Sequence, residues 1–152
     1  MPGKIENRTS LLFEGAARAA LLRKDPFEVR EVYEWADRVI ALPALRNLDD
    51  IRNRVIRLAP VIALIREDSG NRLAKDLADA KVSENRVRRF LESDRDDIDE
   101  QIKRMIRVMK GRAGVESVLL TSIAWGEKMR RRVAQDYFDR PVKRQNDQDA
   151  EA

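Results

Sequence analysis

The spacing of apolar residues constrains the fold of this chain more than any other feature of its sequence. Apolar side chains recur at steps of three and four, which is the period of a helix that buries one face. No segment shows a convincing strand pattern, in which apolar and polar residues alternate. The sequence therefore predicts an all-α fold, a compact helical bundle of about six helices. The clearest apolar stripes cover residues 29–40, 51–65, 98–109 and 118–137.

Capping residues predict where several of these helices begin. Residues 25–28 read Asp-Pro-Phe-Glu, in which the aspartate is a predicted N-cap and the glutamate closes a capping box. Asn71 and Ser83 are further predicted caps, and Pro60 is expected to kink the helix in which it lies. The last four helices are expected over residues 72–80, 83–93, 97–110 and 115–138.

The length of the chain, 152 residues, is enough for one domain with an apolar core. We expect a single helical-bundle domain over residues 1–140, ended by Pro141, and a polar, disordered tail over residues 141–152. The first ten residues contain no signal-peptide core, and the most apolar run, residues 58–65, is too short to span a bilayer. These features predict a cytoplasmic protein without membrane contact.

Two residue types that carry much of enzyme chemistry are missing, because the chain contains neither cysteine nor histidine. A Ser–His or Cys–His nucleophile is therefore excluded, and the commonest general base and metal ligand is absent. The sequence also lacks a phosphate-binding loop, a glycine-rich dinucleotide turn and the spacing of a zinc site. We expect no catalytic residue, no cofactor and no enzymatic activity.

Five acidic residues lie close together where the helix over residues 97–110 is expected to begin. They could form a carboxylate metal or nuclease site, or they could mark a helix start, where the positive end of the helix dipole favours acids. A metal site needs ligands that converge, whereas neighbouring acids at a helix start point in several directions. We therefore interpret Asp97 as an N-cap paired with Glu100 in a capping box, and expect no metal site. The cluster consists of Asp94, Asp96, Asp97, Asp99 and Glu100.

The excess positive charge of the chain comes from residues 101–135. This segment holds nine lysine or arginine residues against two glutamates, a net charge of +7, while the whole chain carries +4. The segment is also expected to form two amphipathic helices joined at residues 111–114. A positive field on a rigid helical hairpin is a candidate surface for a polyanion, and a solvated basic face is the simpler alternative.

Three classes of function remain open on these observations. One is a structural nucleic-acid-binding subunit, and another is an enzyme with a cryptic carboxylate site. The third is a helix-turn-helix transcription regulator, in which residues 83–93 would be the recognition helix. That helix follows the 72–80 helix after about two residues and carries Arg86 and Arg89 near its start, where base-reading side chains are placed.

Residues 70–138 also carry a family resemblance. The segments concerned are NRLAKDLADAKVSENRVRRFLESDR, IDEQIKRMIRVMK and AWGEKMRRRVAQDYF. They contain a Leu-Ala helix, a Ser-Glu-x-Arg helix start, an Asp-Arg turn, a helix with a basic pair, and a final helix that runs from a tryptophan to Asp-Tyr-Phe. In this order the features resemble the small subunit of the type I-E CRISPR surveillance complex (Cascade), the CasB family.

The resemblance implies a non-catalytic helical bundle, present as a homodimer in a crRNA-guided complex for antiviral defence. Its partners would be the crRNA, the target DNA and the other subunits, and it would support the guide–target heteroduplex and hold the displaced strand. Phosphate contacts would suffice, because base pairing with the guide reads the sequence. The contacts carried over from the family are Arg23, Lys24, Arg86, Lys103, Arg104, Lys128 and Arg130, and helix spacing adds Arg89, Arg107 and Arg131.

Overall fold

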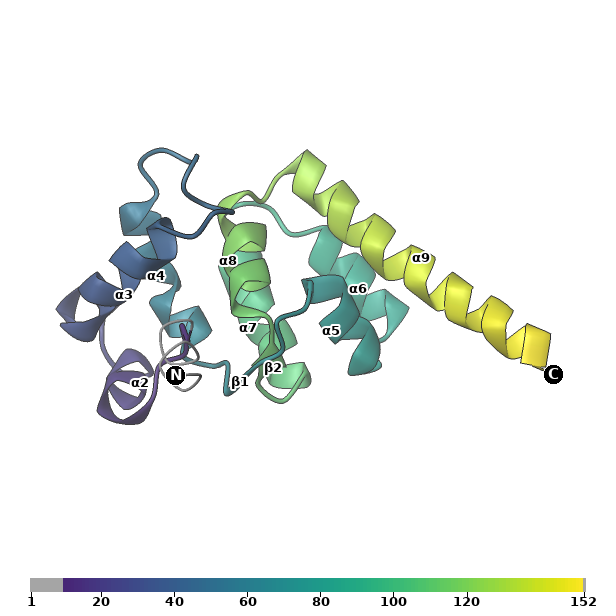
Figure 1. Cartoon of the computed structure of the whole chain (residues 1–152), viewed down its shortest axis with the longest axis horizontal. Coiled ribbons are helices and arrows are strands. Elements are labelled where there is room, and N and C mark those ends of the chain that lie inside the picture. Colours follow the sequence, from purple (N-terminus) through teal and green to yellow (C-terminus); the bar gives the residue numbers. More distant parts are fainter. Residues whose placement is uncertain (1–9, 152) are drawn as a thin grey trace, which may run out of the picture.

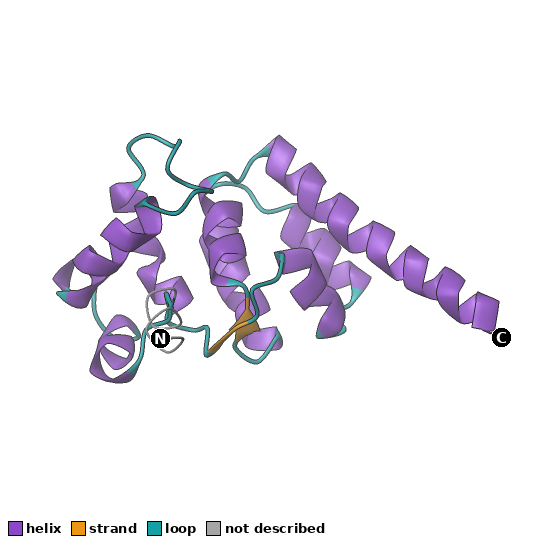
Figure 2. Cartoon of the chain, in the orientation of Figure 1, coloured by secondary structure: helices purple, strands orange, loops and turns teal. Residues whose placement is uncertain are grey.

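The computed structural model describes residues 10–151, with side chains as far as Asp139. Over these residues the protein contains eight α-helices, one short 3-10 helix and two very short strands (Figures 1 and 2). The all-α prediction is confirmed, but the expected count of about six helices is too low. In chain order the elements are α2 (Gly15–Leu21), η1 (Pro26–Glu28), α3 (Glu31–Ile40), α4 (Arg52–Ile62), β1 (Glu67–Asp68), α5 (Leu73–Asp79), α6 (Glu84–Leu91), α7 (Ile98–Val108), β2 (Arg112–Ala113), α8 (Val115–Ile123) and α9 (Glu127–Glu151).

Helix α4 lies at the centre of the fold. It contacts α2, η1 and α3, and also α7 and α8, so it joins the N-terminal helices to the rest of the protein (Figure 1). Most of its residues from Val55 to Ile62 are buried, as expected for a helix that is apolar on nearly all sides. Pro60 lies inside the helix, as the sequence predicted, but the helix ends at Ile62 rather than at residue 65.

The predicted helix caps are confirmed in part. The Arg86 amide donates a hydrogen bond to the Ser83 hydroxyl at 3.3 Å, so Ser83 caps α6 as expected. The Phe27 amide donates to the Asp25 carboxylate at 2.9 Å. The turn that Asp25 caps is the 3-10 helix η1, however, and α3 begins separately at Glu31.

The start of α5 depends on a residue far along the chain rather than on Asn71. The Leu73 amide donates to the Ser117 hydroxyl of α8 at 2.8 Å, across 44 positions of sequence. The side-chain amide of Asn71 instead lies 3.4 Å from the Asp76 carboxylate. The predicted cap is therefore wrong, because a hydroxyl from a neighbouring helix has taken its place.

The helix expected over residues 115–138 is interrupted, and forms α8 and α9. The chain leaves helical geometry at residues 124–126, where Trp125 turns into the core and is only 2% exposed. Its indole nitrogen donates to the Ser93 carbonyl at 2.8 Å, and its ring centre lies 5.4 Å from that of Phe90. The free energy gained by burying this large ring offsets the helix hydrogen bonds that are lost at the break.

Helix α9 continues past Pro141 to Glu151, so Pro141 does not end the helix as the sequence predicted. The side chains of residues 140–152 lie outside the described part of the chain, and the expected disorder of residues 141–152 stays a prediction. Within the described residues, no helix combines the length and the apolar character that crossing a membrane would require.

Strands β1 and β2 form a parallel ladder beside the turn between α7 and α8. Glu67 lies opposite Arg112, and Asp68 lies opposite Ala113. The ladder was not expected from the sequence, because two residues are too few to show an alternating pattern. The hairpin expected from the helices over residues 97–110 and 115–138 is confirmed for its first part, because α7 packs against α8 across this glycine-containing turn.

A buried carboxylate on α5, that of Asp76, holds the chain after β2 in place. Asp76 is 2% exposed, and accepts hydrogen bonds from the Gly114 amide at 3.0 Å and from the Ser69 hydroxyl at 2.8 Å. Gly114 passes so close to Asn71 that a Cβ atom on it would lie 2.1 Å from the Asn71 carbonyl oxygen. Close approach of two backbone segments therefore requires glycine at this position.

We expect Gly114→Ala to lower the free energy of unfolding by about 2–3 kcal/mol, because the new methyl group would push two backbone segments apart. Urea denaturation followed by circular dichroism measures this loss. Gly126→Ala is the matched control, since a Cβ there would meet its nearest neighbour at 3.9 Å, and it should cost less than about 1 kcal/mol. Equal losses in the two variants would contradict the close approach at Gly114.

Candidate nucleic-acid interface

Helix α7 presents basic side chains to solvent because its apolar residues share one face. Arg104 and Arg107 are exposed, and lie three positions apart on one flank. After the helix, Lys110 and Gly111 adopt left-handed backbone conformations, with φ of 59° and 82°, which turn the chain toward β2. The buried residues of the helix are Ile98, Ile102, Met105 and Ile106.

The orientation of α7 is fixed by an ion pair on its inner side. Arg54 of α4 binds both carboxylate oxygens of Asp99, at 2.6 and 2.9 Å. The same guanidinium donates to the Ser122 hydroxyl of α8 at 2.7 Å, and that hydroxyl donates to Asp99 in turn. Helices α4, α7 and α8 therefore meet at this ion pair. The contact is bidentate, and arginine–carboxylate contacts are strongest in this geometry.

Burial of Asp99 alone would raise the pKa of its carboxyl group. The hydrogen bonds from Arg54 and Ser122, and the positive charges of Arg54 and Lys103, outweigh this effect and hold the pKa below its ordinary value. The carboxylate is therefore charged in the folded protein throughout the neutral range, and Lys103 is part of the field that keeps it so.

We expect Asp99→Asn to lower the free energy of unfolding at pH 7 by about 1–2 kcal/mol, because Arg54 loses a charged partner in a half-buried place. The pKa of Asp99 is lower in the folded than in the unfolded chain. Its contribution is thus complete above the unfolded value of about 3.9, and is lost as the pH falls through the folded value.

Urea denaturation at pH 7 and at about pH 2.5 should therefore show a smaller difference between Asp99→Asn and the wild type at the lower pH. Asp96→Asn is the control, because the Asp96 side chain is exposed and has no ion pair within residues 10–139. It should follow the wild type at both pH values. A difference that did not shrink in acid would argue against the lowered pKa of Asp99.

The remaining acids of the cluster are arranged differently from the capping box that the sequence predicted. The carboxylate of Asp94, not that of Asp97, accepts hydrogen bonds from the Asp96 and Asp97 amides, each at 3.0 Å. Asp97 makes no side-chain cap bond, and Glu100 pairs with Lys103 at 3.1 Å. The three acids that have partners, Asp94, Asp99 and Glu100, bind different ones, and no group of three or more acidic side chains within residues 10–139 could hold a metal ion.

The ten predicted contact residues fall into two groups in the structure. Lys103, Arg130 and Arg131 bind other groups of the same chain, among them Glu127, which forms an exposed ion pair with Arg131 at 2.5 Å. The other seven are exposed and have no ion pair or side-chain hydrogen bond within residues 10–139, so their charges face solvent. These seven are Arg23, Lys24, Arg86, Arg89, Arg104, Arg107 and Lys128.

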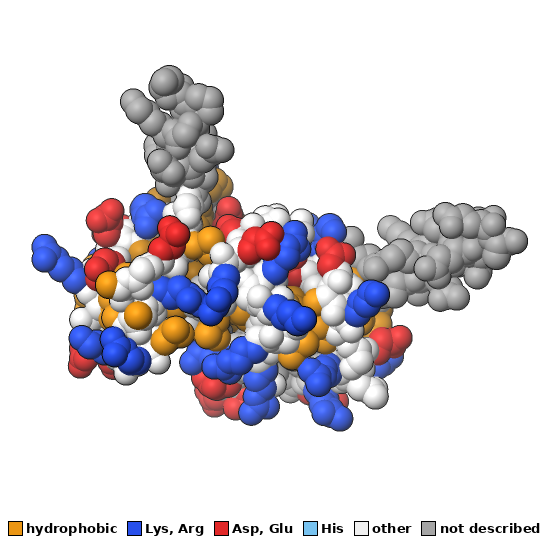
Figure 3. All heavy atoms as spheres, turned by 90° about the horizontal axis from the view of Figure 1, so that it is seen from below, with side chains coloured by type: hydrophobic (Ala, Val, Ile, Leu, Met, Phe, Trp, Pro, Cys, Tyr) orange, Lys and Arg blue, Asp and Glu red, His pale blue; other side chains and the backbone are white. Residues whose placement is uncertain are grey.

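The structure brings some of the seven together and leaves others apart. Helix α6 contacts both α7 and α9, so the predicted residues of these three helices belong to one part of the fold. Arg23 and Lys24 directly follow α2, which contacts α4 among the N-terminal helices (Figure 1). Lysine and arginine side chains spread along most of the face shown in Figure 3.

Arg130 differs from the other predicted cations because its guanidinium supports the fold. Its terminal nitrogen donates to the Ser93 carbonyl at 2.9 Å, and the group lies over the Trp125 ring, 5.5 Å from the ring centre. Its Nε atom is buried and has no hydrogen-bond partner among residues 10–139. These contacts tie the start of α9 to the connection between α6 and α7, and the role of Arg130 in nucleic-acid binding stays a prediction.

We expect Arg130→Gln to lower the free energy of unfolding by about 1–2 kcal/mol, because the Ser93 carbonyl loses a charged donor and Trp125 loses a cation over its ring. Chemical denaturation followed by tryptophan fluorescence measures the loss. The control is Arg131→Gln, which removes a neighbouring arginine that is exposed and should change stability by less than about 0.5 kcal/mol. Similar stability of both variants would show that the Arg130 contacts contribute little.

Two further exposed cations lie beside the ladder and were not among the predicted contacts. The Arg66 amide donates to the Gly111 carbonyl at 2.8 Å, which places Arg66 next to Lys110. Neither side chain has a partner within the described residues, whereas the nearby Arg112 binds Glu67 at 3.2 Å. The sequence gives no sign that residue 66 reaches this turn, because only the β1–β2 pairing brings it there.

The sequence of this chain matches the family of CRISPR-associated protein Cse2 over residues 17–138. No curated protein and no solved structure matches it. The family match covers all helices from α3 to α8, and with them the predicted contact residues of α6 and α7. Because it spans most of the 152 residues, the protein belongs to the Cse2 family, the small subunits of the type I-E CRISPR surveillance complex (Cascade).

Proposed function

We propose that this subunit holds nucleic acid inside the surveillance complex by binding phosphates, without reading bases and without catalysis. The observation that carries the proposal is the set of seven predicted cations whose charges are not used by the fold. Arginine and lysine side chains that face solvent can neutralise phosphates at no cost to internal ion pairs. Membership of the family supplies the setting, a complex with crRNA and other subunits.

Binding through the backbone of the nucleic acid, rather than through its bases, is favoured by the aromatic residues. Trp35 is fully buried and Trp125 is 2% exposed, so neither can stack on a base. The Tyr33 hydroxyl is bonded to the Phe27 carbonyl at 2.6 Å, and Arg52 lies over its ring. Base pairing with the guide RNA would supply the specificity, so phosphate contacts would suffice for this subunit.

The partners that we propose are the guide–target heteroduplex and the displaced DNA strand. We call the seven solvent-facing cations the basic surface. In the complex the subunit would be present as a homodimer, so this surface would occur twice along the nucleic acid. A surface repeated in this way suits a long, regular polyanion, because phosphates recur at a constant spacing along each strand.

The regulator alternative receives no support from the family, although α5 and α6 are consecutive helices joined by a short turn at residues 80–83. Arg86 and Arg89 on α6 are exposed, as they would have to be for reading bases. The two functions differ in one measurable property: a regulator prefers one duplex sequence, whereas a phosphate-binding subunit does not.

We expect the double substitution Arg104→Gln and Arg107→Gln to weaken binding to all sequences alike. The slope of the logarithm of affinity against the logarithm of salt concentration should become flatter by roughly two contacts, each worth about 0.7 to 0.9 in slope. Fluorescence anisotropy with single- and double-stranded DNA across a salt series measures this. Thermal stability should barely change, because both side chains are exposed and form no ion pair with the described side chains.

The control is Arg30→Gln with Arg46→Gln, which removes two exposed arginines from the N-terminal part of the protein, outside the predicted interface. This variant has the same net charge as the first, so any difference between the two reports the position of the arginines. We expect it to flatten the salt slope far less, because its two arginines lie outside the predicted interface. Equal effects of the two variants would mean that net charge alone attracts DNA. A strong preference for one duplex sequence that is lost with Arg86→Gln would overturn the proposal in favour of the regulator.

A further inference from the structure

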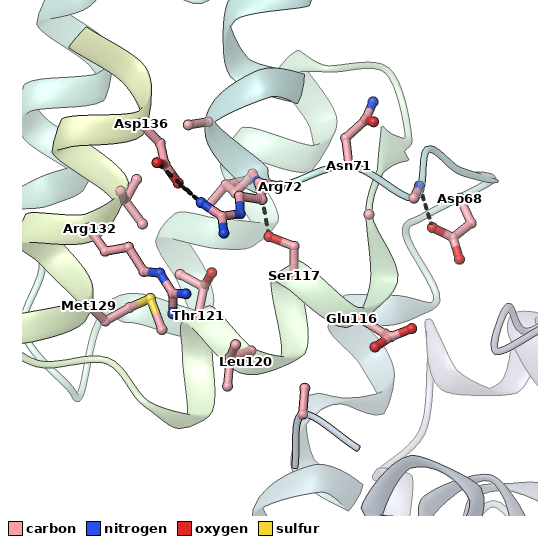
Figure 4. A pocket seen from close by; sticks show the side chains of 16 residues that line it. Asp68, Asn71, Arg72, Glu116, Ser117, Leu120, Thr121, Met129, Arg132 and Asp136 are labelled. Atoms are coloured by element: carbon pink, nitrogen blue, oxygen red, sulfur yellow. Dashed lines mark hydrogen bonds and ion pairs between the residues drawn. The ribbon is translucent and has the colours of Figure 1, made fainter. Parts of the chain in front are cut away.

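A pocket of about 360 Å³ lies away from the α6 and α7 cations, between α5, α8 and the start of α9 (Figure 4). Ala44, in the connection between α3 and α4, closes one side of it. The volume is at the lower end of the range for binding pockets, and suits one or two side chains rather than a whole helix. Nothing in the proposed binding of phosphates uses this pocket.

The floor of the pocket is apolar. Leu73 and Ala74 from α5 are each 1% exposed, and Met129 and Val133 from α9 are 8% and 5% exposed. Leu120 of α8 completes this floor. An apolar side chain placed here would leave water and contact apolar atoms from three helices, which is the usual source of affinity in a small pocket.

Thr121 supplies an unused hydrogen-bonding group in the wall. This residue is 3% exposed and lines the pocket, and its hydroxyl has no hydrogen-bond partner within residues 10–139. The hydroxyl oxygen itself is not fully buried, so a ligand in the pocket could form a hydrogen bond with it. In Figure 4 the side chain of Arg132 extends across the pocket beside Thr121.

The charges around the pocket differ from those of the proposed phosphate-binding surface. Arg132 has no ion pair within the described residues, whereas Arg72 is partly neutralised by Asp136 at 3.2 Å. Asp68 and Glu116 lie toward the opposite side of the pocket (Figure 4). Three carboxylates and two guanidinium groups give the lining a net negative charge, which repels a chain of phosphates. Arg132 lies on the side away from Asp68 and Glu116, so it remains available for a single negative charge (Figure 4).

We propose that this pocket docks a segment of a partner protein that carries an apolar residue next to an acidic one. The apolar side chain would cover the floor, and the carboxylate would bind between the Arg132 guanidinium and the Thr121 hydroxyl. A protein segment fits better than a nucleic-acid strand, because the strand would bring several phosphates near Asp136 and Glu116, whereas the segment brings a single carboxylate. The site is therefore an interface with a protein, separate from the basic surface.

The probe for this site is the capped dipeptide N-acetyl-Leu-Asp-amide, titrated into the full ¹⁵N-labelled chain and followed by NMR. We expect the amide signals of Leu73, Ser117 and Thr121 to shift with one common dissociation constant. N-acetyl-Leu-Asn-amide has the same shape without the charge, and should bind roughly tenfold more weakly, because a hydrogen bond to a charged group is lost. Uridine 5′-monophosphate tests the nucleotide alternative.

Two variants test the residues that would hold the carboxylate. Arg132→Gln should weaken the aspartate peptide by roughly tenfold and leave the asparagine peptide unchanged. Thr121→Val keeps the shape of the side chain but removes the hydroxyl, and should weaken the aspartate peptide by about threefold or more. Arg104→Gln is the matched control, since it removes an arginine of the basic surface, and should leave both peptides unchanged.

Three results would overturn the proposal. Equal binding of the two peptides would show that no carboxylate site exists, and absence of shifts at the pocket residues would show that the segment does not dock there. Tighter binding of uridine 5′-monophosphate than of the aspartate peptide would assign the pocket to nucleic acid instead. None of these results bears on the salt dependence of DNA binding, so the proposed phosphate-binding function is tested separately.

Discussion

The pair formed by Arg54 and Asp99 is the contact on which the placement of the basic surface depends. It joins the central helix α4 to α7, and through Ser122 it includes α8. The two side chains are only 26% and 28% exposed, so water competes less with their hydrogen bonds than at a surface ion pair. The direction in which α7 presents its arginines is therefore determined on its opposite, buried side.

Arginine has a second role in this fold, as a donor to backbone carbonyls that lie between helices. Arg18 donates to the Ala63 carbonyl at 2.7 Å, just after α4, and Arg130 donates to the Ser93 carbonyl between α6 and α7. Such carbonyls have no partner within a helix, and a charged donor satisfies them well. A count of positive residues along the sequence therefore overstates the number that face solvent.

The features that the sequence predicted correctly are local ones. The periodic apolar stripes predict the helical fold, and the exposed flank of Arg104 and Arg107 follows from the same periodicity. The break at residues 124–126 is not predictable in this way, because the carbonyl that binds Trp125 lies 32 positions away at Ser93. Arg130 donates to the same carbonyl from 37 positions away, so helix spacing alone could not show that its guanidinium is engaged inside the protein.

The β1–β2 ladder has a consequence for folding kinetics. Its outer pair, Glu67 and Arg112, lies 45 positions apart in sequence, and α5, α6 and α7 lie within the loop that it closes. Closing a loop of this length costs entropy that two ladder residues alone repay poorly, so we expect the helices inside it to pack first. Arg66 and Lys110 would then come together late in folding, and a chain that stalls before this step would lack this pair of cations.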